Sequence, residues 1–436
     1  MIAERFCAQR LPGLPDGDPP ITPLYDSLTT NLPHPVMAYT SFPFPPSTPL
    51  FPDASVVRSY LESFCDHFNL ARHVCLNTTV ERVWRCPTTH WRVQLSTGEI
   101  LSFDLVIVAN GHHSKPHYPC TPGLTKWLSV HRATHSAWYR NPRNFGKSVL
   151  VVGGGPSGRD IAAELRTVTD TVIHSIKGVT SEDIGDLNLR GRVREFKDDH
   201  EVCFEDGSTE TGVDHCILAT GYELDFPFLD KSAIQCDLPL PRNLFESSWH
   251  FIPLAKHIFP LRAGYPPHSL AFLGLPMTVV PFPLLEAQAR AIVEVFARPN
   301  MLDEIKEIAD IVARYETLKK RFRDNHEYIG RQWYRFYGNE QFDYRDQLYE
   351  FSERDPERRI VVPEWAKEMY DKKNVLRANW NNLERTGDAA RWVNGVGEGG
   401  QDEWIDLMRK LLDVNDHVTL KSSHRLSSKF SSCCVI

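Results

Sequence analysis

Apolar residues recur along the chain with two different spacings, and these separate predicted helices from predicted strands. Residues 54–68 place apolar side chains three or four positions apart, which predicts a helix with one buried face. Shorter runs either alternate apolar with polar residues or are apolar throughout, and both patterns are typical of strands. The predicted strands lie in the runs TTVERVWRC, HWRVQLSTGEI, FDLVIVANG, SVLVV, TVIHSI and DHCILATGY, and a hairpin is expected at HEVCFEDGSTE.

Two regions outside these strands have a different character. The first fifty residues are rich in proline, as in FPFPPSTPLFP, and predict an extended segment with many turns. Beyond Pro299 the pattern becomes that of charged helices with one apolar stripe, formed by Leu302, Ile305, Ile308, Ile311, Val312, Tyr315 and Leu318. The last residues, KSSHRLSSKFSSCCVI, are small and polar and predict a disordered tail.

A glycine-rich turn joins one of the buried strands to the helix that follows it. SVLVV is followed by Gly153, Gly155 and Gly158 in the spacing G-x-G-x-x-G, and RDIAAEL continues as a helix. The first glycine permits a tight turn, the second lets a pyrophosphate approach the backbone, and the third allows the helix to pack closely on the strand. Phosphates would bind the free N–H groups at the positive end of the helix dipole, so the sequence predicts a dinucleotide site.

The residues after the next strand indicate which dinucleotide binds. A carboxylate there bonds the ribose hydroxyls of NAD or FAD, whereas a basic residue accommodates the additional 2′-phosphate of NADP. Here the strand reaches Ser175 and is followed by Lys177, and no acidic residue occurs before Glu182. The sequence therefore predicts NADPH. The alternative is that Lys177 is an ordinary solvent-exposed lysine.

Composition excludes several other classes of protein. The 436 residues are 42% hydrophobic and 24% charged, which is typical of a globular protein of two or three domains. A formal net charge of −7 argues against nucleic-acid binding. No apolar run reaches the length of a membrane span, and we expect a cytoplasmic protein. The ten cysteines include no C-x-x-C pair, so neither a metal site nor a disulfide reductase is expected.

Several stretches together resemble the flavin-containing monooxygenase family. TTNLPHPVMAYTSFPFP is similar to that family's TNLP and FPF segment, FDLVIVANGHHSKPHYP resembles its A-x-G-H-H turn, and ATGY matches another of its motifs. HSAWYR fits the second half of the family signature, which places His135 and Tyr139 on it. In the first half, Ser129 and His131 stand where the family has Phe and Gly. The resemblance covers residues 29–290.

This resemblance implies an α/β fold of the two-dinucleotide-binding flavoproteins, with Rossmann-like three-layer domains. An NADP domain is then inserted into an FAD domain, and a helical extension follows. The domains expected are an N-terminally incomplete first part of the FAD domain, the NADP domain, the second part of the FAD domain, the helical region and the tail, at residues 1–145, 146–214, 215–299, 300–420 and 421–436.

The same resemblance implies a monooxygenase that uses FAD, NADPH and O2. In the family a flavin hydroperoxide transfers one oxygen atom to a soft nucleophile, here expected to be an amine nitrogen or a sulfur of a small molecule. Asn31 is the residue that the resemblance makes catalytic, because the family's asparagine at this position lies beside the flavin and bound NADP. From the sequence alone, the alternative is that Asn31 is an ordinary turn residue before Leu-Pro.

The resemblance assigns further residues to the two cofactors. Thr30, Asn31 and Leu32 would contact flavin, and Gly111, Thr220 and Gly221 would approach FAD where the domains cross. NADP would contact Gly153, Gly155, Ser157, Gly158, Arg159, Asp160, Ser175 and Lys177. Structural roles are expected for three histidines, since no metal-ligand spacing is evident around His112, His113 and His135.

One feature of the family is missing from this sequence. The family begins with a strand, a G-x-G-x-x-G turn and a helix that bind FAD, well ahead of the TNLP segment. Here only thirty residues precede Asn31, and residues 1–20 contain neither the strand nor glycines in the G-x-G-x-x-G spacing. We expect either a start clipped from a longer chain or a genuine short form, a catalytically impaired remnant that binds NADP without FAD.

The chain ends in CCVI, which has the form of a prenylation motif with Cys433 at the modified position. Lys421, Arg425 and Lys429 lie upstream, and one lipid with such a weakly basic tail would give reversible membrane association. Isoleucine is not a usual last residue of the motif. Membrane association through Cys433 is therefore the alternative to a purely cytoplasmic protein.

Overall fold

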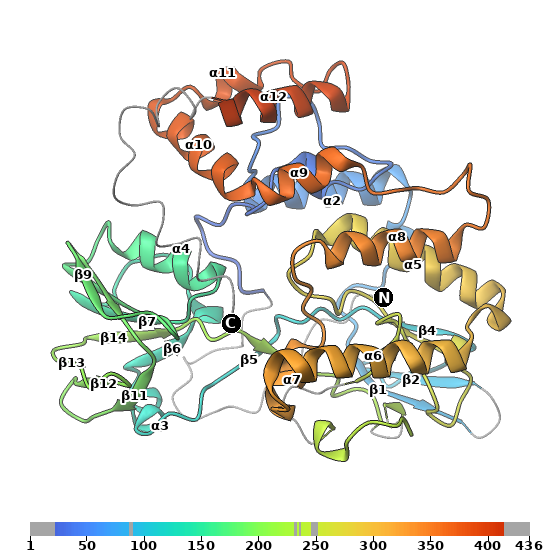
Figure 1. Cartoon of the computed structure of the whole chain (residues 1–436), viewed down its shortest axis with the longest axis horizontal. Coiled ribbons are helices and arrows are strands. Elements are labelled where there is room, and N and C mark those ends of the chain that lie inside the picture. Colours follow the sequence, from blue (N-terminus) through green and yellow to red (C-terminus); the bar gives the residue numbers. More distant parts are fainter. Residues whose placement is uncertain (1–21, 87–89, 231–232, 235–236, 246–251, 414–436) are drawn as a thin grey trace.

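The computed structural model describes residues 22–86, 90–230, 233–234, 237–245 and 252–413. The chain forms two lobes, with a layer of helices across the top of the view (Figure 1). One lobe is built on a parallel sheet, and the other combines small sheets with long helices. The C-terminal tail and Cys433 lie outside the described residues, as do residues 1–20.

A six-stranded sheet forms the centre of the first lobe. Neighbouring strands are parallel, except that the last strand pairs antiparallel with its neighbour. The predicted strands SVLVV, TVIHSI and DHCILATGY are adjacent in this sheet. The full order is β6 (Ala133–His135), β14 (His215–Leu218), β7 (Ser148–Val152), β8 (Thr171–Ser175), β10 (Leu187–Arg190) and β9 (Glu182–Ile184).

Consecutive residues of β7 point to opposite faces of this sheet, because side chains alternate along a strand. Val149 and Val151 pack with Ile161 and Leu165 of helix α4. Leu150 instead joins the apolar cluster of the other face, with Trp127. Both faces are therefore covered, which gives three layers. The covering elements are α4 (Pro156–Leu165) on one face, and α3 (Leu124–Ser129), β11 (Val193–Phe196), β12 (Val202–Phe204) and β13 (Thr209–Glu210) on the other.

The nucleotide lobe extends beyond the residues 146–214 expected from the sequence. β6 precedes that range and β14 follows it, and both are hydrogen-bonded into the same sheet. The chain enters this lobe after β5 (Lys115–Pro116) and leaves it before β15 (Tyr222–Glu223), and these two strands pair with each other. β6 has only three residues, too few for an apolar pattern to predict it.

The second lobe contains the other predicted strands. TTVERVWRC and HWRVQLSTGEI form an antiparallel sheet together with a strand that begins at the last residue of the second run, and FDLVIVANG pairs in parallel with a strand far along the chain. The middle strand β2 alternates buried and half-buried residues, as its sequence pattern predicted. The elements are α1 (His34–Met37), α2 (Ala54–His67), β1 (Val80–Arg85), β2 (Trp91–Leu95), β3 (Ile100–Phe103), β4 (Val106–Val108), β16 (Leu254–Ala255), β17 (Phe259–Pro260), β18 (Leu270–Phe272) and α5 (Pro281–Ala297).

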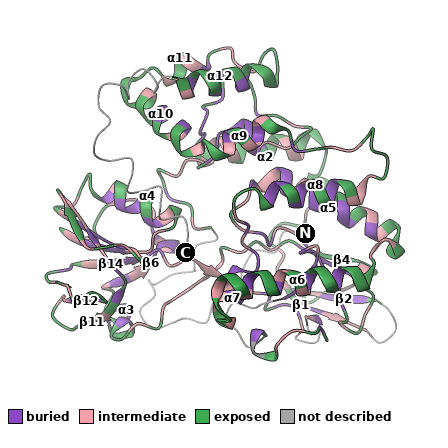
Figure 2. Cartoon of the chain, in the orientation of Figure 1, coloured by how far each residue is buried: buried purple, intermediate pink, exposed green. Residues whose placement is uncertain are grey.

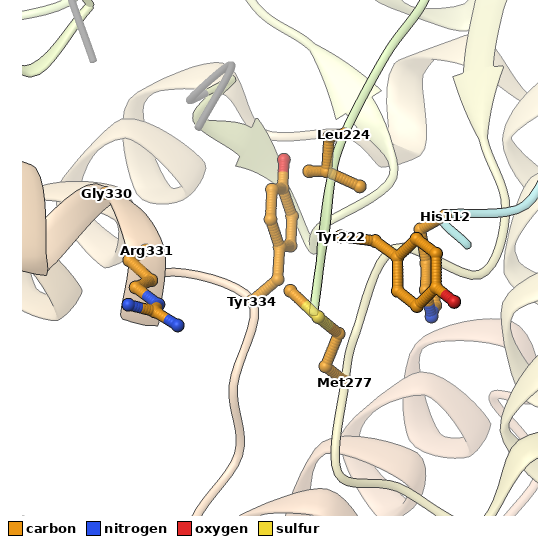
Figure 3. A pocket seen from close by; sticks show the side chains of 7 residues that line it. All are labelled: His112, Tyr222, Leu224, Met277, Gly330, Arg331 and Tyr334. Atoms are coloured by element: carbon orange, nitrogen blue, oxygen red, sulfur yellow. The ribbon is translucent and has the colours of Figure 1, made fainter. Parts of the chain in front are cut away.

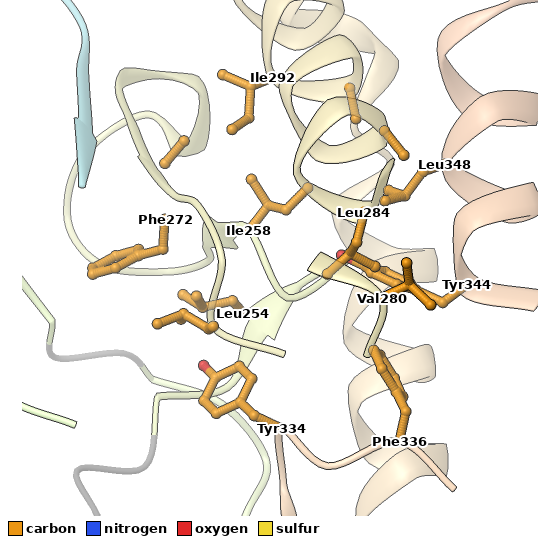
Figure 4. Close-up of a cluster of buried hydrophobic side chains, with 14 of the residues drawn as sticks. Leu254, Ile258, Phe272, Val280, Leu284, Ile292, Tyr334, Phe336, Tyr344 and Leu348 are labelled. Carbon is orange, nitrogen blue, oxygen red and sulfur yellow. The ribbon is translucent and has the colours of Figure 1, made fainter. Parts of the chain in front are cut away.

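The core of this lobe lies where β16, β17 and β18 meet the helices that follow them. Leu254 and Phe272 of these strands pack with Leu284 of α5, and with Tyr344 and Leu348 from the C-terminal helices (Figure 4). Burial is concentrated on the inner faces of the helices, while their outer faces are exposed (Figure 2). The charged outer faces predicted beyond Pro299 are thus confirmed.

Beyond residue 300, the described part of the chain is helical, in agreement with the predicted helical extension. The helices are α6 (Glu304–Phe322), α7 (His326–Gln332), α8 (Glu340–Ser352), α9 (Glu364–Asp371), α10 (Lys373–Thr386), α11 (Ala389–Val393) and α12 (Gln401–Asp413). In α6, Ile308, Ile311, Tyr315 and Leu318 are buried as predicted. Ile305 is 84% exposed, which corrects the predicted stripe, because it lies in the first turn at the edge of the apolar arc.

Candidate functional site

The glycine turn after β7 has the geometry that the spacing predicted. Gly153 has a φ of +129°, and a Cβ at this position would lie less than 3.0 Å from the carbonyl group of Ala219. A Cβ on Gly158 would lie equally close to the carbonyl oxygen of Gly153. Gly155 differs, since a Cβ there would have no heavy atom within 4 Å. The first and third glycines therefore permit backbone packing, and the second faces open space.

Helix α4 begins at this turn with its backbone donors free of side-chain caps. Gly155 is the N-cap residue, Pro156 follows it, and no side chain accepts a hydrogen bond from the first turn. Uncapped N–H groups at a helix N-terminus bind anions, since the helix dipole adds a partial positive charge there. The turn therefore fits the pyrophosphate of a dinucleotide.

His174 supports the turn from the neighbouring strand β8. Its Nε2 lies 2.8 Å from the carbonyl oxygen of Gly153, and burial lowers the pKa of the ring. The ring is therefore neutral near pH 7 and donates from Nε2. The backbone N–H of Gly153 donates to Ser175 at 2.9 Å. His174 was not predicted from the sequence, although a histidine in an otherwise apolar strand is a visible exception.

The residues predicted to bind the NADP ribose and its phosphate lie at the end of β8. Lys177 is exposed, and its Nζ lies 5.2 Å from the ring centroid of Tyr328 in α7. Ser175 is 2% exposed, and its hydroxyl donates to the carbonyl group of Gly191. A bond from Ser175 to a ribose would require this contact to break, whereas Lys177 is accessible.

The remaining residues predicted for NADP lie on the first turns of α4. Ser157 is half-buried, and Arg159 is exposed. Asp160 is exposed, and its carboxylate accepts a hydrogen bond from the Tyr25 hydroxyl at 2.8 Å. The carboxylate of Asp160 is thereby directed to the N-terminal segment.

Two glycine turns lie where the chain crosses between the lobes. Gly111 and Gly221 have φ values of +74° and +83°, and neither has a heavy atom near its Cβ position. Thr220 donates its hydroxyl hydrogen to the carbonyl group of His117, whose N–H donates to Gly221 at 2.9 Å. Both A-x-G motifs, which the resemblance assigns to FAD, therefore leave open space at their glycines.

His135 holds the second crossing turn in place. Its Nδ1 accepts from the N–H of Ala137 at 3.1 Å, so Nε2 carries the proton and donates to the carbonyl group of Gly221 at 3.0 Å. Burial lowers the pKa of His135 to about 3. Tyr139, the other signature residue, is buried and donates to Glu164 of α4 at 2.6 Å. His135 thus holds the backbone of the crossing turn, whereas Tyr139 contacts a side chain of α4.

A small cavity separates the crossing turns from helix α7 (Figure 3). Its volume is about 20 Å³, and it is lined by His112, Tyr222, Leu224, Met277, Gly330, Arg331 and Tyr334. Arg331 comes from α7, a helix for which the sequence predicted no role at the site. The Nδ1 of His112 lies 3.1 Å from the carbonyl oxygen of Gly274, and burial lowers its pKa, as expected for a structural histidine.

Asn31 lies on the segment that leads into α1. Thr30 donates its hydroxyl hydrogen to the carbonyl group of Leu32 at 2.8 Å, and its N–H donates to Pro52 at 2.9 Å. Leu32 is buried, whereas Asn31 is exposed, and its side chain forms no hydrogen bond within the described residues. Pro33 is the N-cap residue of α1, and no side chain caps that helix. The amide of Asn31 is thus available to a ligand.

The described residues fit the two cofactors unequally. One strand, G-x-G-x-x-G turn and helix unit is present among them, and its accessible Lys177 suits NADP. On the FAD side, β4 and β18 form a parallel pair that no other described strand extends. The open turns at Gly111 and Gly221 offer contacts to FAD, but the described part of the chain holds no second turn for its pyrophosphate.

Metal-binding and membrane-spanning features are not found in the part of the chain that the structure describes. In the described segments, no three His, Cys, Asp or Glu residues are arranged to hold a metal ion. Among the helices that the structure describes, none combines the length and the apolar character that a membrane crossing requires.

Comparison with known sequences identifies similar proteins. A family model described as flavin-binding monooxygenase-like matches residues 16–181 and 180–344. The flavin-containing monooxygenase FMO GS-OX-like 1 of Arabidopsis thaliana is 31% identical over 312 residues, which are 68% of this chain and 64% of that protein. The thiol-specific monooxygenase of Saccharomyces cerevisiae is 31% identical over 296 residues, or 63% of this chain and 65% of that protein. The chain therefore spans slightly less than two thirds of the length of either relative.

Solved structures give the same picture of the fold. S-allyl-L-cysteine S-oxygenase from Allium sativum superimposes with a TM-score of 0.70 at 27% identity, covering 90% of this chain and 85% of that one. Tmm from a Pelagibacter strain gives a TM-score of 0.64 at 20% identity, covering 84% and 79%. The predicted fold class, a two-dinucleotide-binding α/β flavoprotein with a helical C-terminal region, is confirmed.

Proposed function

We propose, because this chain belongs to the flavin-binding monooxygenase-like family, that it is an FAD- and NADPH-dependent monooxygenase acting on a small molecule. The observation that carries the proposal is the open, uncapped glycine turn at the start of α4. Bound flavin, once reduced, supplies the activation of O2 that no amino-acid side chain can supply. The chain's own residues bind, orient and shield the reactants.

We propose sulfur as the preferred atom of the substrate. Two of the similar proteins are named for sulfur chemistry, a thiol-specific monooxygenase and an S-allyl-cysteine S-oxygenase. An amine nitrogen, which the family resemblance equally implies, is the alternative. Competition between a thioether and a tertiary amine in one assay, with both oxides quantified, tests this preference.

For NADPH, the backbone N–H groups between Gly153 and Gly158 hold the pyrophosphate at the N-terminus of α4. Lys177, accessible beside Tyr328, neutralises the 2′-phosphate. For the flavin, the open turns at Gly111 and Gly221 receive the cofactor between the lobes. Asn31 offers an amide that can donate and accept hydrogen bonds beside the reacting atoms.

A second candidate function follows from the single dinucleotide unit in the described residues. The chain would then bind NADP without FAD and lack oxygenation activity. Purified protein separates the two candidates. A yellow protein that consumes NADPH faster when a thioether is added supports the monooxygenase, and a colourless protein that binds NADP supports the alternative.

The nucleotide assignment predicts a specific effect at Lys177. Replacing it by alanine removes the cation that faces the 2′-phosphate, so Kd for NADPH should rise about tenfold, as expected for loss of a charge-assisted contact. Kd for NADH should stay within about twofold. Lys147→Ala is the matched control, since Lys147 is exposed and 3.8 Å from Asp170. An equal loss of affinity for NADPH and for NADH in Lys177→Ala would reject this role.

A further inference from the structure

The N-terminal segment that presents Asn31 is held at one end by a residue from the C-terminal helices. Arg377 of α10 donates from Nη1 to the carbonyl oxygen of Thr30, and from Nη2 to the hydroxyl oxygen of Thr29. Its guanidinium carbon lies 5.0 Å from the ring centroid of Phe51. One side chain, distant in sequence, thus contacts two consecutive residues immediately before Asn31.

The other end of the segment is fixed to the nucleotide lobe. The Tyr25 hydroxyl donates to Asp160 of α4 at 2.8 Å, and Tyr25 packs edge-on against Tyr139 with ring centroids 5.8 Å apart. The N–H of Asp26 donates to the carbonyl group of Arg140 at 2.8 Å. The segment therefore bridges the helix that begins at the glycine turn and the C-terminal helix α10.

The surroundings of Arg377 combine burial of its guanidinium with negative charge nearby. Burial lowers the pKa of Arg377, while the negative charge of Asp160 opposes this shift. The described contacts of the guanidinium are to a carbonyl and a hydroxyl group, with the Phe51 ring beside it. Its planar fork reaches two acceptors at once, which a lysine ammonium on a flexible stem reproduces poorly.

The contact to Thr30 acts directly on Asn31. The carbonyl group of Thr30 and the N–H of Asn31 belong to one planar peptide unit, so fixing the oxygen fixes the plane from which the Asn31 backbone continues. The bonds of Thr30 to Pro52 and Leu32 hold the neighbouring atoms. Asn31 is left as an exposed side chain on a restrained backbone.

We propose that Arg377 is a positioning residue for Asn31, so that helix α10 forms part of the active site although it lies beyond the residues that the family model matches. This inference rests on the proposed function for its catalytic consequence. Its structural part, restraint of the segment by Arg377, is independent of that function and can be measured without cofactors.

The first experiment measures hydrogen–deuterium exchange of the full chain without cofactors. In Arg377→Met, amides of the peptide that spans Thr29 to Leu32 should exchange at least about tenfold faster, because the bonds that order this segment are lost. Peptides from α4 should be unchanged. Arg385→Met is the matched control, since Arg385 lies on the same helix and is exposed. Unchanged exchange at Thr29 to Leu32 in Arg377→Met overturns the proposal.

The second experiment measures coupling in flavin-loaded enzyme. Arg377→Met should give about tenfold less oxygenated product per NADPH consumed, the remainder appearing as hydrogen peroxide, because small misplacements of a reacting group are costly. KM for NADPH and the thermal midpoint should match those of Arg385→Met. Arg377→Lys should recover part of the coupling. A loss of product that follows loss of bound flavin or of folded protein would indicate a merely structural role and overturn the assignment.

A double-mutant cycle tests whether Arg377 acts through Asn31. If it does, the double variant Asn31→Ala/Arg377→Met should form as much oxygenated product per NADPH as Asn31→Ala alone. The second change then removes support from a side chain that is already absent. Fully additive losses would overturn this route. A wild-type enzyme without oxygenation activity would reject the proposed function, and the exchange experiment would still decide whether Arg377 restrains the segment.

Discussion

Gly158 lies where helix α4 packs against the backbone of the preceding turn. A Cβ there would approach the carbonyl oxygen of Gly153 closer than 3.0 Å, and that backbone atom has little room to move because His174 and Ser175 both bond Gly153. The third glycine of the motif is therefore a packing requirement. The second glycine has open space instead, so the two positions should respond differently to the same substitution.

We predict that Gly158→Ala lowers the free energy of unfolding by about 1–3 kcal/mol, the usual cost of overpacking. It should also weaken NADP binding, because the turn must shift. Gly155→Ala should leave stability almost unchanged, since φ is −73° and no atom lies within 4 Å, yet should still weaken NADP binding by blocking the pyrophosphate. Urea unfolding and calorimetric titration with NADP separate the two effects. Equal destabilisation by both variants would contradict this account.

Burial of His135 in its neutral form makes the stability of the folded protein decrease as the pH falls. Its pKa is about 3 in the folded state and about 6.5 when unfolded, so at pH 5 only the unfolded chain binds the proton, and folding is disfavoured. The destabilisation is only about 0.2 kcal/mol at pH 7, grows as the pH falls, and amounts to about 2 kcal/mol at pH 5.

His135→Gln, which can donate and accept hydrogen bonds but cannot be protonated, should lose about 2 kcal/mol less stability than wild type between pH 7 and pH 5. Urea unfolding at the two pH values measures this difference. Identical pH dependence in both proteins would show that His135 is not buried in its neutral form.

At the scale of elements, the sequence predicted those whose residues carry a repeating pattern. β7, β8 and β14 are continuous apolar runs between covered faces, and β2 alternates as a half-buried strand does. β5, β6 and β15 were not predicted, because strands of two or three residues depend on partners elsewhere in the chain. The contact of Arg377 with Thr29 spans 348 positions, and no local pattern encodes it.

The contact between α12 and the N-terminal segment gives another test. Trp404 is 4% exposed, and its ring centroid lies 4.4 Å from that of His34. Trp404→Ala should cost about 3–5 kcal/mol, the usual range for a buried tryptophan, and should make α12 more susceptible to trypsin at Arg409. Ile305→Ala, at an 84% exposed site, should change stability by less than about 0.5 kcal/mol. Undiminished stability in Trp404→Ala would show that α12 does not hold this segment.

At the scale of the molecule, the candidate site combines parts that lie far apart in the sequence. The glycine turn comes from the nucleotide lobe, Gly111 and Gly221 from the two crossings, and Asn31 from a segment held by α10. Sequence motifs predicted each of these parts. The contacts of His174, Arg331 and Arg377 with these parts could not be predicted, because they join residues that are brought together only in the folded chain.

Ligand binding should therefore stabilise the whole chain. NADP at about 100 times its Kd should raise the free energy of unfolding by about 2.7 kcal/mol, and NAD at the same concentration should do less. FAD should add a further increase if the proposed monooxygenase assignment holds, and none if the chain binds NADP alone. Differential scanning calorimetry of the purified chain with each ligand measures these shifts. Equal shifts with NADP and NAD would reject the role of Lys177.

The paired strands β5 and β15 bring the two ends of residues 117–221 together, with the N–H of His117 bonded to the carbonyl group of Gly221. A unit whose two ends lie close together can be inserted into or removed from a protein with little effect on the rest of the fold. We therefore expect that residues 117–221 can be produced as a separate fragment, or exchanged for the corresponding unit of a relative with a different nucleotide preference. Under the proposed function, such an exchange should change which nucleotide the protein uses while the other lobe keeps its fold.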